Sequence, residues 1–211
     1  MSRVLLVDDH AVVRTGFRLL LQVRPDITVV GEAESGEAAC QRYLELSPDV
    51  VVMDIAMPGM GGIEALRRIR AHDPQARVLA LSAHDDPMHA RRALREGALG
   101  FLSKRSAPEA LLEAVADVSA GRRYIDPRVA QKLALEDIEG TESSPLKRLS
   151  EREFDVFIRL ARGTSVQRIA EDLKLSASTV GTHLYNVKQK LGVSNQSELT
   201  LLAIRHGLIE A

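Results

Sequence analysis

The stretch Asp49-Val50-Val51-Val52-Met53-Asp54 decides the fold of this chain. Four apolar residues, three of them β-branched valines, stand between two carboxylates. An uninterrupted apolar run of this length is typical of a parallel strand that is covered on both faces. Asp54 then lies where the strand leaves the sheet, and open α/β sheets bind ligands at the carboxyl ends of their strands. Residues 55–62 are rich in Pro and Gly, so the backbone can come close to a ligand held by Asp54.

Short apolar segments and amphipathic helical segments alternate on both sides of that stretch. Strands are expected at residues 4–7, 27–30, 50–54, 78–81 and 100–102, and each is followed by a helical pattern. Five such alternations within about 120 residues indicate an α/β fold with a doubly wound, five-stranded parallel sheet. Right-handed crossovers then place helices on both faces of the sheet.

The second part of the chain has a different pattern. Residues 122–145 contain an expected short helix at 128–135 and then a polar, acidic stretch with Gly and Pro, which is typical of a linker. Four short helical segments follow within residues 146–211, and the first begins with the capping-box pattern Ser-Glu-Arg-Glu. We therefore expect a first domain at 3–121, a linker at 122–145 and a small all-α, four-helix domain at 146–211.

The composition is that of an ordinary globular protein, with 45% apolar and 27% charged residues among 211. There is no run of about 18 apolar residues and no signal-peptide pattern, so we expect no membrane association. The single Cys40 cannot form an internal disulfide, which fits a reducing, cytoplasmic location. Residues 146–211 carry ten Lys or Arg and seven Asp or Glu, a net charge of +3 that permits nucleic-acid binding without deciding it.

Polar side chains follow four of the expected strands, and they are Asp8, Asp9, Asp54, Ser82 and Lys104. Parallel strands share their carboxyl edge, so these side chains can converge. Three carboxylates repel one another unless a cation joins them, and oxygen ligands suit Mg²⁺. A lysine and a hydroxyl beside them would suit phosphoryl transfer onto a carboxylate. Taken singly, Asp9 would be a helix cap, Ser82 a turn residue and Lys104 a solvated charge, but the whole set at one sheet edge favours a site.

Residues 174–177 separate the second and third helices of the small domain by the spacing of a helix-turn-helix. The third helix is apolar on one face, and residues 176–191 include no acidic residue. Candidate DNA contacts on its polar face and flanks are Ser178, Thr179, Gly181, Thr182, Tyr185, Asn186, Lys188 and Gln189. Hydroxyls and amides could read bases while lysines neutralise phosphates, although a solvated helix face has the same pattern. Gly181 costs about 1 kcal/mol relative to Ala, which either close approach to DNA or simple tolerance would explain.

Residues 3–121 resemble the flavodoxin-like receiver domain of bacterial two-component response regulators. The matching residues are Asp8-Asp9, Asp54 with Met57-Pro58-Gly59 behind it, Ser82-Ala83, Phe101 and Lys104. The resemblance implies that Asp54 accepts a phosphoryl group from a sensor histidine kinase. It also implies a Mg²⁺ ion held by Asp9, Asp54 and the carbonyl of Ala56, with Asp8 assisting. Ser82 and Phe101 would be the switch pair, in which the hydroxyl moves onto the phosphoryl group and the ring turns inward.

Ala56 lies two residues beyond Asp54 and bears on the lifetime of that phosphoryl group. Its methyl group cannot hydrogen-bond an attacking water molecule. We therefore expect slow self-dephosphorylation, unless His84 orients the water instead.

Residues 146–211 resemble the LuxR-type helix-turn-helix, and the matches include Leu149-Ser150-Glu151-Arg152-Glu153, Ile169-Ala170, Thr179-Val180 and Lys190-Leu191-Gly192-Val193. With the receiver in front, the chain resembles the NarL/FixJ class of response regulators, closest to the GacA/UvrY/SirA branch. This implies a phosphorylation-controlled regulator that binds promoter double-stranded DNA, is not an enzyme, and acts globally through small RNAs. It also implies that the fourth helix of the domain, 197–205, pairs two copies after phosphorylation frees it, and the candidate dimer contacts are Leu199, Leu202 and Ala203. Many members carry Lys where this chain has Ser178, so one positive contact is absent.

Two other classes of function stay open on the residues alone. The helical domain could bind protein instead of DNA, which would make the chain a phosphorylation-dependent signalling adaptor. Residues 179–190 offer few exposed apolar anchors for such a partner. An α/β phosphatase or NTPase is less consistent with the sequence, because the motifs G-x-x-x-x-G-K-[ST] and G-x-S-x-G are missing.

Overall fold

The computed structural model describes residues 1–83, 87–138, 145–173, 175–206 and 208–209. The chain divides into two compact units, Met1–Leu135 and Glu136–Ala211, and each is described by itself. No helix within the described ranges is long and apolar enough to span a bilayer.

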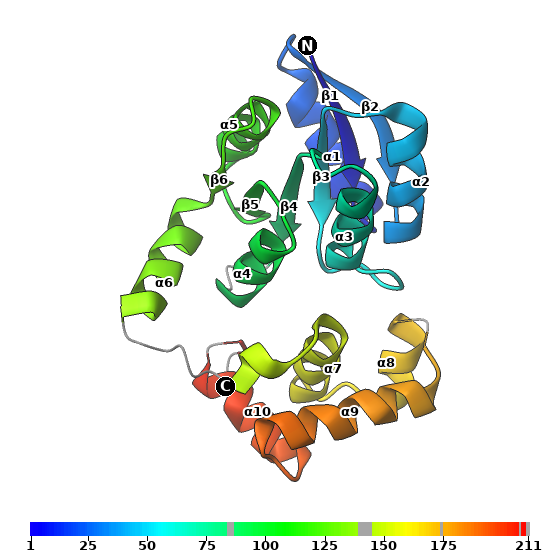
Figure 1. The fold of residues 1–211 in the computed structure, drawn as a ribbon, viewed down its shortest axis with the longest axis vertical. Coiled ribbons are helices and arrows are strands. Elements are labelled where there is room, and N and C mark those ends of the chain that lie inside the picture. Colours follow the sequence, from blue (N-terminus) through cyan, green and yellow to red (C-terminus); the bar gives the residue numbers. More distant parts are fainter. Residues whose placement is uncertain (84–86, 139–144, 174, 207, 210–211) are drawn as a thin grey trace. The chain divides into compact units, whose positions relative to one another are not determined.

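The first unit is built on a parallel sheet (Figure 1). Its strands are β1 (Ser2–Val7), β2 (Ile27–Ala33), β3 (Val50–Asp54), β4 (Val78–Ser82), β5 (Gly100–Ser103) and β6 (Tyr124–Ile125). Their order is β2-β1-β3-β4-β5-β6, and every neighbouring pair is parallel. The expected doubly wound fold is confirmed, but the prediction of five strands was wrong by one, because β6 has only two residues and is too short to show a periodicity.

Helices cover both faces of this sheet. They are α1 (Ala11–Gln22), α2 (Gly36–Leu46), α3 (Gly62–His72), α4 (Pro87–Arg95) and α5 (Pro108–Ser119), and a further helix, α6 (Pro127–Ile138), follows β6. Apolar residues of α2, α3 and α4 pack with Leu5 and Val51 on one face, whereas those of α1 and α5 pack with Leu6 and Val52 on the other. All five residues of β3 are buried, which explains its uninterrupted apolar sequence.

The residues after α5 remain attached to the first unit. The amide of Asp126 donates to the carbonyl of Phe101 at 2.9 Å, and Ser106 Oγ donates to the buried carboxylate of Asp126. Val129 of α6 is fully buried in the same core as Phe101, with Leu133 packed against it. The first part of the segment expected to be a linker therefore contributes a strand and a helix to the first unit.

Among the described residues from 145 onward, a short 3₁₀ turn precedes four helices, and the sequence predicts these four helices. These elements of the second unit are η2 (Pro145–Arg148), α7 (Glu151–Ala161), α8 (Val166–Asp172), α9 (Ala177–Leu191) and α10 (Gln196–Arg205). Side-chain oxygens of Ser150, Ser165, Ser176 and Asn195 accept hydrogen bonds from the first turns of these helices. Such N-caps satisfy backbone amides that have no partner inside the helix. Asn195 caps α10, which begins one residue before the start expected from the sequence at 197.

Glu153 connects the start of α7 to the end of α9. Its Oε2 accepts from the amide of Ser150 at 2.6 Å and lies 2.6 Å from Lys190 Nζ, and the residue is only 4% exposed. Burial acts to raise the pKa of Glu153, but hydrogen bonds from Lys190 and Ser150 outweigh it and hold the pKa below its usual value. The carboxylate form therefore stabilises the junction of α7 and α9.

Replacing Glu153 with Gln is expected to lower the stability of the second unit at neutral pH by about 1–2 kcal/mol. Because the folded-state pKa of Glu153 is depressed, its contribution is present above the unfolded-state value and is lost as the pH falls through the folded-state value. The deficit should therefore shrink in acid. Urea-dependent hydrogen exchange of α7 and α9 measures it, with the exposed Glu171→Gln as the control. Equal losses in the two variants would contradict this assignment.

Candidate functional site

The strand order brings four chemically important side chains to one edge of the sheet. Asp8 follows β1, Asp54 ends β3, Ser82 ends β4 and Lys104 follows β5, and these four strands are neighbours. Asp54 pairs in register with Leu81, which places it beside Ser82. The predicted convergence at the carboxyl edge is thus present in the fold.

Lys104 bridges two buried carboxylates. Its Nζ lies 2.5 Å from Asp8 Oδ2 and 2.7 Å from Asp54 Oδ2, while both aspartates are 2% exposed. The second oxygen of Asp54 accepts from the amide of Ala56 at 2.9 Å, and Oδ1 of Asp8 accepts from the amide of His10 at 2.8 Å. One ammonium group thus compensates two carboxylates, which leaves a net negative charge at the site.

The protonation equilibria of Asp54 and Lys104 reflect this burial. Burial raises the pKa of the Asp54 carboxyl, and the attraction and hydrogen bond of Lys104 and the Ala56 amide offset this rise only in part. Burial acts to lower the pKa of Lys104, but the two carboxylates outweigh it and raise that pKa above its usual value. The ammonium form of Lys104 is thus favoured at the site, where it can neutralise negative charge on an incoming group.

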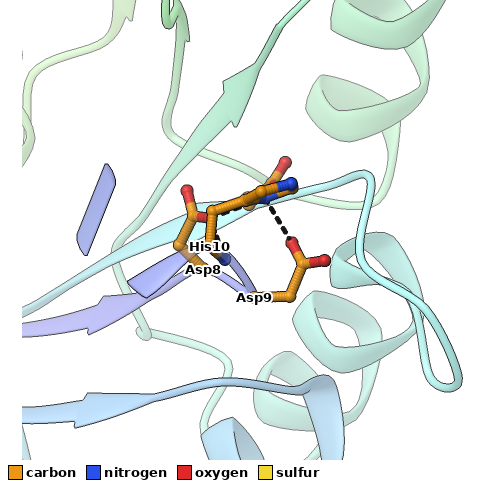
Figure 2. A group of neighbouring side chains, drawn as sticks. Asp8, Asp9 and His10 are labelled. Atoms are coloured by element: carbon orange, nitrogen blue, oxygen red, sulfur yellow. Dashed lines mark hydrogen bonds and ion pairs between the residues drawn. The ribbon is translucent and has the colours of Figure 1, made fainter. Parts of the chain in front are cut away.

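A further carboxylate, that of Asp9, lies beside this pair. Asp9 Oδ1 is buried and has no hydrogen-bond partner within the described part of the chain. Ligand atoms of Asp8, Asp9, Asp54 and His10 all lie within 4.8 Å of one another. Figure 2 shows the His10 ring directed toward the two carboxylates that precede it. A surplus of negative charge and a buried carboxylate oxygen without a hydrogen bond suit a divalent cation, so these residues fit a metal site.

The other residues expected at the site lie as follows. Ala56 is exposed, Ser82 is buried at the end of β4, and Phe101 is fully buried in the core. Phe101 therefore already has the inward position that the sequence analysis assigned to the phosphorylated form. His84, the alternative water-orienting residue, lies outside the described residues.

Sequence reasoning missed two residues at this edge. His10 comes next to Asp8-Asp9 in the sequence, so its adjacency was a signal that could have been used. Arg14 donates from Nη1 to the backbone carbonyl of Asp8 at 2.6 Å and from Nε to Glu32 at 3.0 Å. Arg14 lies one turn into α1, and no pattern in the sequence indicates that its side chain contacts Asp8.

The second unit presents the polar face of α9 to solvent. Val180 and Val187 are buried on the opposite face, as the apolar period predicts. Ser178, Thr179, Gly181, Thr182, Tyr185 and Gln189 are exposed, and Asn186 and Lys188 are partly exposed. The hydroxyl of Thr182 donates to the carbonyl of Ser178 at 3.2 Å, and Tyr185 is 63% exposed. The surface of α9 thus offers hydroxyl, amide and phenol groups, with lysines at its C-terminal end.

The candidate dimer contacts on α10 need correction. Leu199 and Ala203 are fully buried in the core of their own unit, where α10 packs against α7. Leu202 is partly exposed, and Leu201 is the large apolar side chain that α10 exposes, at 55%. Leu199 and Ala203 therefore cannot form a surface for a second copy while the domain is folded.

Comparison with known proteins matches both units. The family of response regulator receiver domains matches residues 4–116, and the luxR family of bacterial regulatory proteins matches residues 147–203. The chain is 41% identical over 211 residues to the response regulator GacA of Pseudomonas protegens, covering 100% of this chain and 99% of that protein. It is 42% identical over 212 residues to the response regulator UvrY of Escherichia coli K12, covering 100% of this chain and 97% of that protein.

A solved structure extends the comparison to both units together. RcsB of Salmonella enterica serovar Typhimurium, bound to promoter rprA in the presence of the phosphomimetic BeF3⁻, is 29% identical with a TM-score of 0.68. The match covers 95% of this chain and 97% of that one. The chain therefore belongs to the two-component response regulators that combine a receiver domain with a LuxR-type helix-turn-helix.

Proposed function

We propose that this chain is a transcription regulator whose promoter binding is controlled by phosphorylation of Asp54. The main support for this proposal is the pair of buried carboxylates, Asp8 and Asp54, which Lys104 bridges. The same chain also exposes the polar face of α9. The relatives GacA and UvrY are both named as response regulators. Proteins of this class regulate transcription and are not enzymes. The phosphoryl donor that this class implies is a sensor histidine kinase, and the expected location is the cytoplasm.

Transfer to Asp54 requires little beyond position and charge. An oxygen of Asp54 forms the new P–O bond as the P–N bond of the donor phosphohistidine breaks. Lys104 stays within reach of the same carboxylate and neutralises the charge of the phosphoryl group. A Mg²⁺ ion held by Asp8, Asp9, Asp54 and the carbonyl of Ala56 would supply further neutralisation of the phosphoryl oxygens.

Ser82 is the proposed sensor of the phosphoryl group. It ends β4 next to Asp54, so a small movement brings its hydroxyl to a phosphoryl oxygen. The Phe101 ring is already buried in this conformation. Phosphorylation of Asp54 would therefore keep the ring in its inward position and would not need to turn it inward. Phosphate has an effect only if it favours the DNA-binding state over the other state.

Ala56 determines how long this signal lasts. It is exposed beside the phosphoacceptor and offers only a methyl group to an incoming water molecule. We expect the phosphorylated protein to lose phosphate slowly, and a time course on the purified protein measures the rate. A half-life of seconds would contradict the role given to Ala56.

The exposed face of α9 is the proposed DNA-reading surface. Its amides and hydroxyls can contact base edges in the major groove, and Lys188 can contact phosphate. RcsB, which shares this architecture, has been solved on promoter DNA and as two dimers bound to two parallel DNAs. With a net charge of only +3, a single copy of residues 146–211 should bind DNA weakly, so two copies on paired half-sites are proposed.

Phosphorylation is proposed to favour that homodimer. The exposed side of α10, which carries Leu201, replaces the buried Leu199 and Ala203 as the candidate contact. The similarity to GacA and UvrY further supports a global regulator that acts through small-RNA genes.

A salt titration separates this function from that of a protein-binding adaptor. The regulator should bind random duplex DNA with an affinity that falls steeply with salt, because each neutralised phosphate adds about −0.9 to the slope of log K against log salt. Lys188→Ala should make that slope less steep, whereas the control Lys132→Ala, on an exposed position of α6, should leave it unchanged. An adaptor would show no salt-dependent DNA binding at all.

Replacing Gly181 with Ala decides between the two explanations for this glycine. An added Cβ meets nothing within 4 Å among the described residues, and the position is inside α9. Ala should therefore stabilise the second unit by about 0.5–1 kcal/mol. If DNA approaches this backbone closely, the same variant should bind promoter DNA several-fold more weakly. Anisotropy and hydrogen exchange measure the two effects, and unchanged affinity would leave only tolerance as the explanation.

A further inference from the structure

His10 occupies the N-cap position of α1 without capping the helix. At that position Ser, Thr, Asp or Asn normally accepts a hydrogen bond from the first turn. The His10 side chain makes no such hydrogen bond among the described residues. Its Nδ1 lies instead 3.0 Å from Asp9 Oδ1 and 3.4 Å from Asp8 Oδ1 (Figure 2). The imidazole is therefore directed at the carboxylate cluster rather than at the helix.

The oxygen that faces this imidazole is Asp9 Oδ1, which is buried and accepts no hydrogen bond from the described residues. A buried carboxylate oxygen without a hydrogen bond is costly unless a cation provides the missing contact. Two ligands of one ion, at about 2.1–2.3 Å each, can lie no more than about 4.5 Å apart. The ligand atoms of Asp8, Asp9, Asp54 and His10 lie within 4.8 Å of one another, so a small contraction suffices for all four to reach one ion.

Lys104 leaves this side of the cluster open. Its Nζ contacts the Oδ2 atoms of Asp8 and Asp54, whereas the His10 ring lies on the side of the Oδ1 atoms of Asp8 and Asp9. The His10 side chain is 66% exposed, so the ring can adjust its position at little steric cost. A cation could therefore contact the imidazole without displacing the ammonium group.

We propose that Nδ1 of His10 is a ligand of the divalent cation held by Asp8, Asp9 and Asp54. This nitrogen shifts the selectivity of the site from Mg²⁺ toward first-row transition dications. Mg²⁺ prefers oxygen ligands, whereas imidazole adds affinity for transition metals. The inference rests on the proposed function, because it requires the cation site of the receiver.

Manganese is the probe that tests the proposal on the full-length chain. Electron paramagnetic resonance measures the affinity for Mn²⁺ directly, and displacement of Mn²⁺ by added Mg²⁺ gives the affinity for Mg²⁺. Spin-echo modulation by ¹⁴N reports a nitrogen ligand. In His10→Ala the Mn²⁺ affinity should fall about tenfold, while the Mg²⁺ affinity changes less than about twofold. The nitrogen modulation should disappear, and the control His72→Ala, on the exposed end of α3, should match the wild type.

Two results overturn the proposal, and they are distinguishable. If the wild type binds Mn²⁺ but shows no nitrogen modulation, or if both affinities fall by the same factor in His10→Ala, His10 is not a ligand and the cation site stands. If the wild type binds neither ion, or Asp9→Asn binds both as tightly as the wild type, the cation site itself is wrong. That second result removes the metal from the proposed function as well.

Discussion

Replacing Lys104 with methionine is expected to lower the stability of the first unit by about 3–5 kcal/mol, the usual cost of removing one partner from a buried ion pair. The Nζ of Lys104 is the cation that contacts the carboxylates of Asp8 and Asp54, 2.5 and 2.7 Å away. Without it, two buried negative charges repel each other. The same variant should accept phosphate far more slowly, because no ammonium group remains to neutralise the transferred group.

The pH dependence of this loss has a defined sign. The folded-state pKa of Asp54 is already raised, with burial as the largest cause, and removal of Lys104 takes away the main opposing effect. A carboxyl with a raised folded-state pKa favours folding when it is protonated. The loss of stability in Lys104→Met should therefore be largest at neutral pH. It should shrink as the pH falls from the raised folded-state pKa of Asp54 toward the unfolded-state pKa. Divalent cations should also reduce this loss, because the folded cluster binds them more tightly once the competing Lys104 ammonium group is gone.

Urea-dependent hydrogen exchange of β1, β3 and β5 measures the stability of the first unit separately from that of the second. Lys132→Met is the matched control, because Lys132 is exposed on α6 and its replacement should change the stability by less than about 0.5 kcal/mol. A Lys104→Met variant as stable as this control would show that the carboxylates do not depend on the ammonium group.

The second large effect is expected at Gly62, the first residue of α3. A Cβ at this position would lie 2.0 Å from the carbonyl oxygen of Asp54 and 2.7 Å from Cα of Ile55. Both are backbone atoms, so no side-chain rotation can relieve the overlap. Gly62→Ala must move either α3 or the end of β3, and we expect it to cost at least about 3 kcal/mol.

The displacement should also reach the phosphoacceptor, because the overlapping atom belongs to Asp54 itself. We therefore expect Gly62→Ala to be phosphorylated poorly by a small-molecule phosphodonor even at temperatures where it remains folded. Gly16→Ala is the control, since a Cβ there meets nothing within 4 Å among the described residues. That change, inside α1, should instead stabilise the unit by about 0.5–1 kcal/mol. Normal phosphorylation of a stable Gly62→Ala variant would contradict the close approach of α3 to β3.

Much of the site could be predicted because it depends on strand ends. The apolar run that ends at Asp54, and the similar runs before Asp8, Ser82 and Lys104, identify strands by composition alone. A parallel sheet then brings the residues that follow to one edge. Packing determines the distances in the site, the bridging position of Lys104 and the burial that raises the pKa of Asp54. The hydrophobic periodicity of the sequence does not predict these features.

The errors have equally specific causes. The apolar period of α10 correctly indicates that Leu199 and Ala203 share a face, but a period does not say whether the partner is another copy or α7 of the same chain. In β6, two residues are too few to show alternation, and the strand forms because β5 offers a free edge. His10 was missed because a helix N-cap is normally explained by the helix it begins.

The central claim is that phosphorylation of Asp54 controls DNA binding by α9. Fluorescence anisotropy tests it most directly, with the wild type and Asp54→Asn, each with and without a small-molecule phosphodonor plus Mg²⁺. The duplex would come from upstream of a small-RNA gene of the same genome. We predict that the phosphodonor tightens binding of the wild type about tenfold, a typical allosteric coupling, and leaves Asp54→Asn unchanged. Equal affinity of the wild type with and without the phosphodonor, or tightening in Asp54→Asn as well, would contradict the claim.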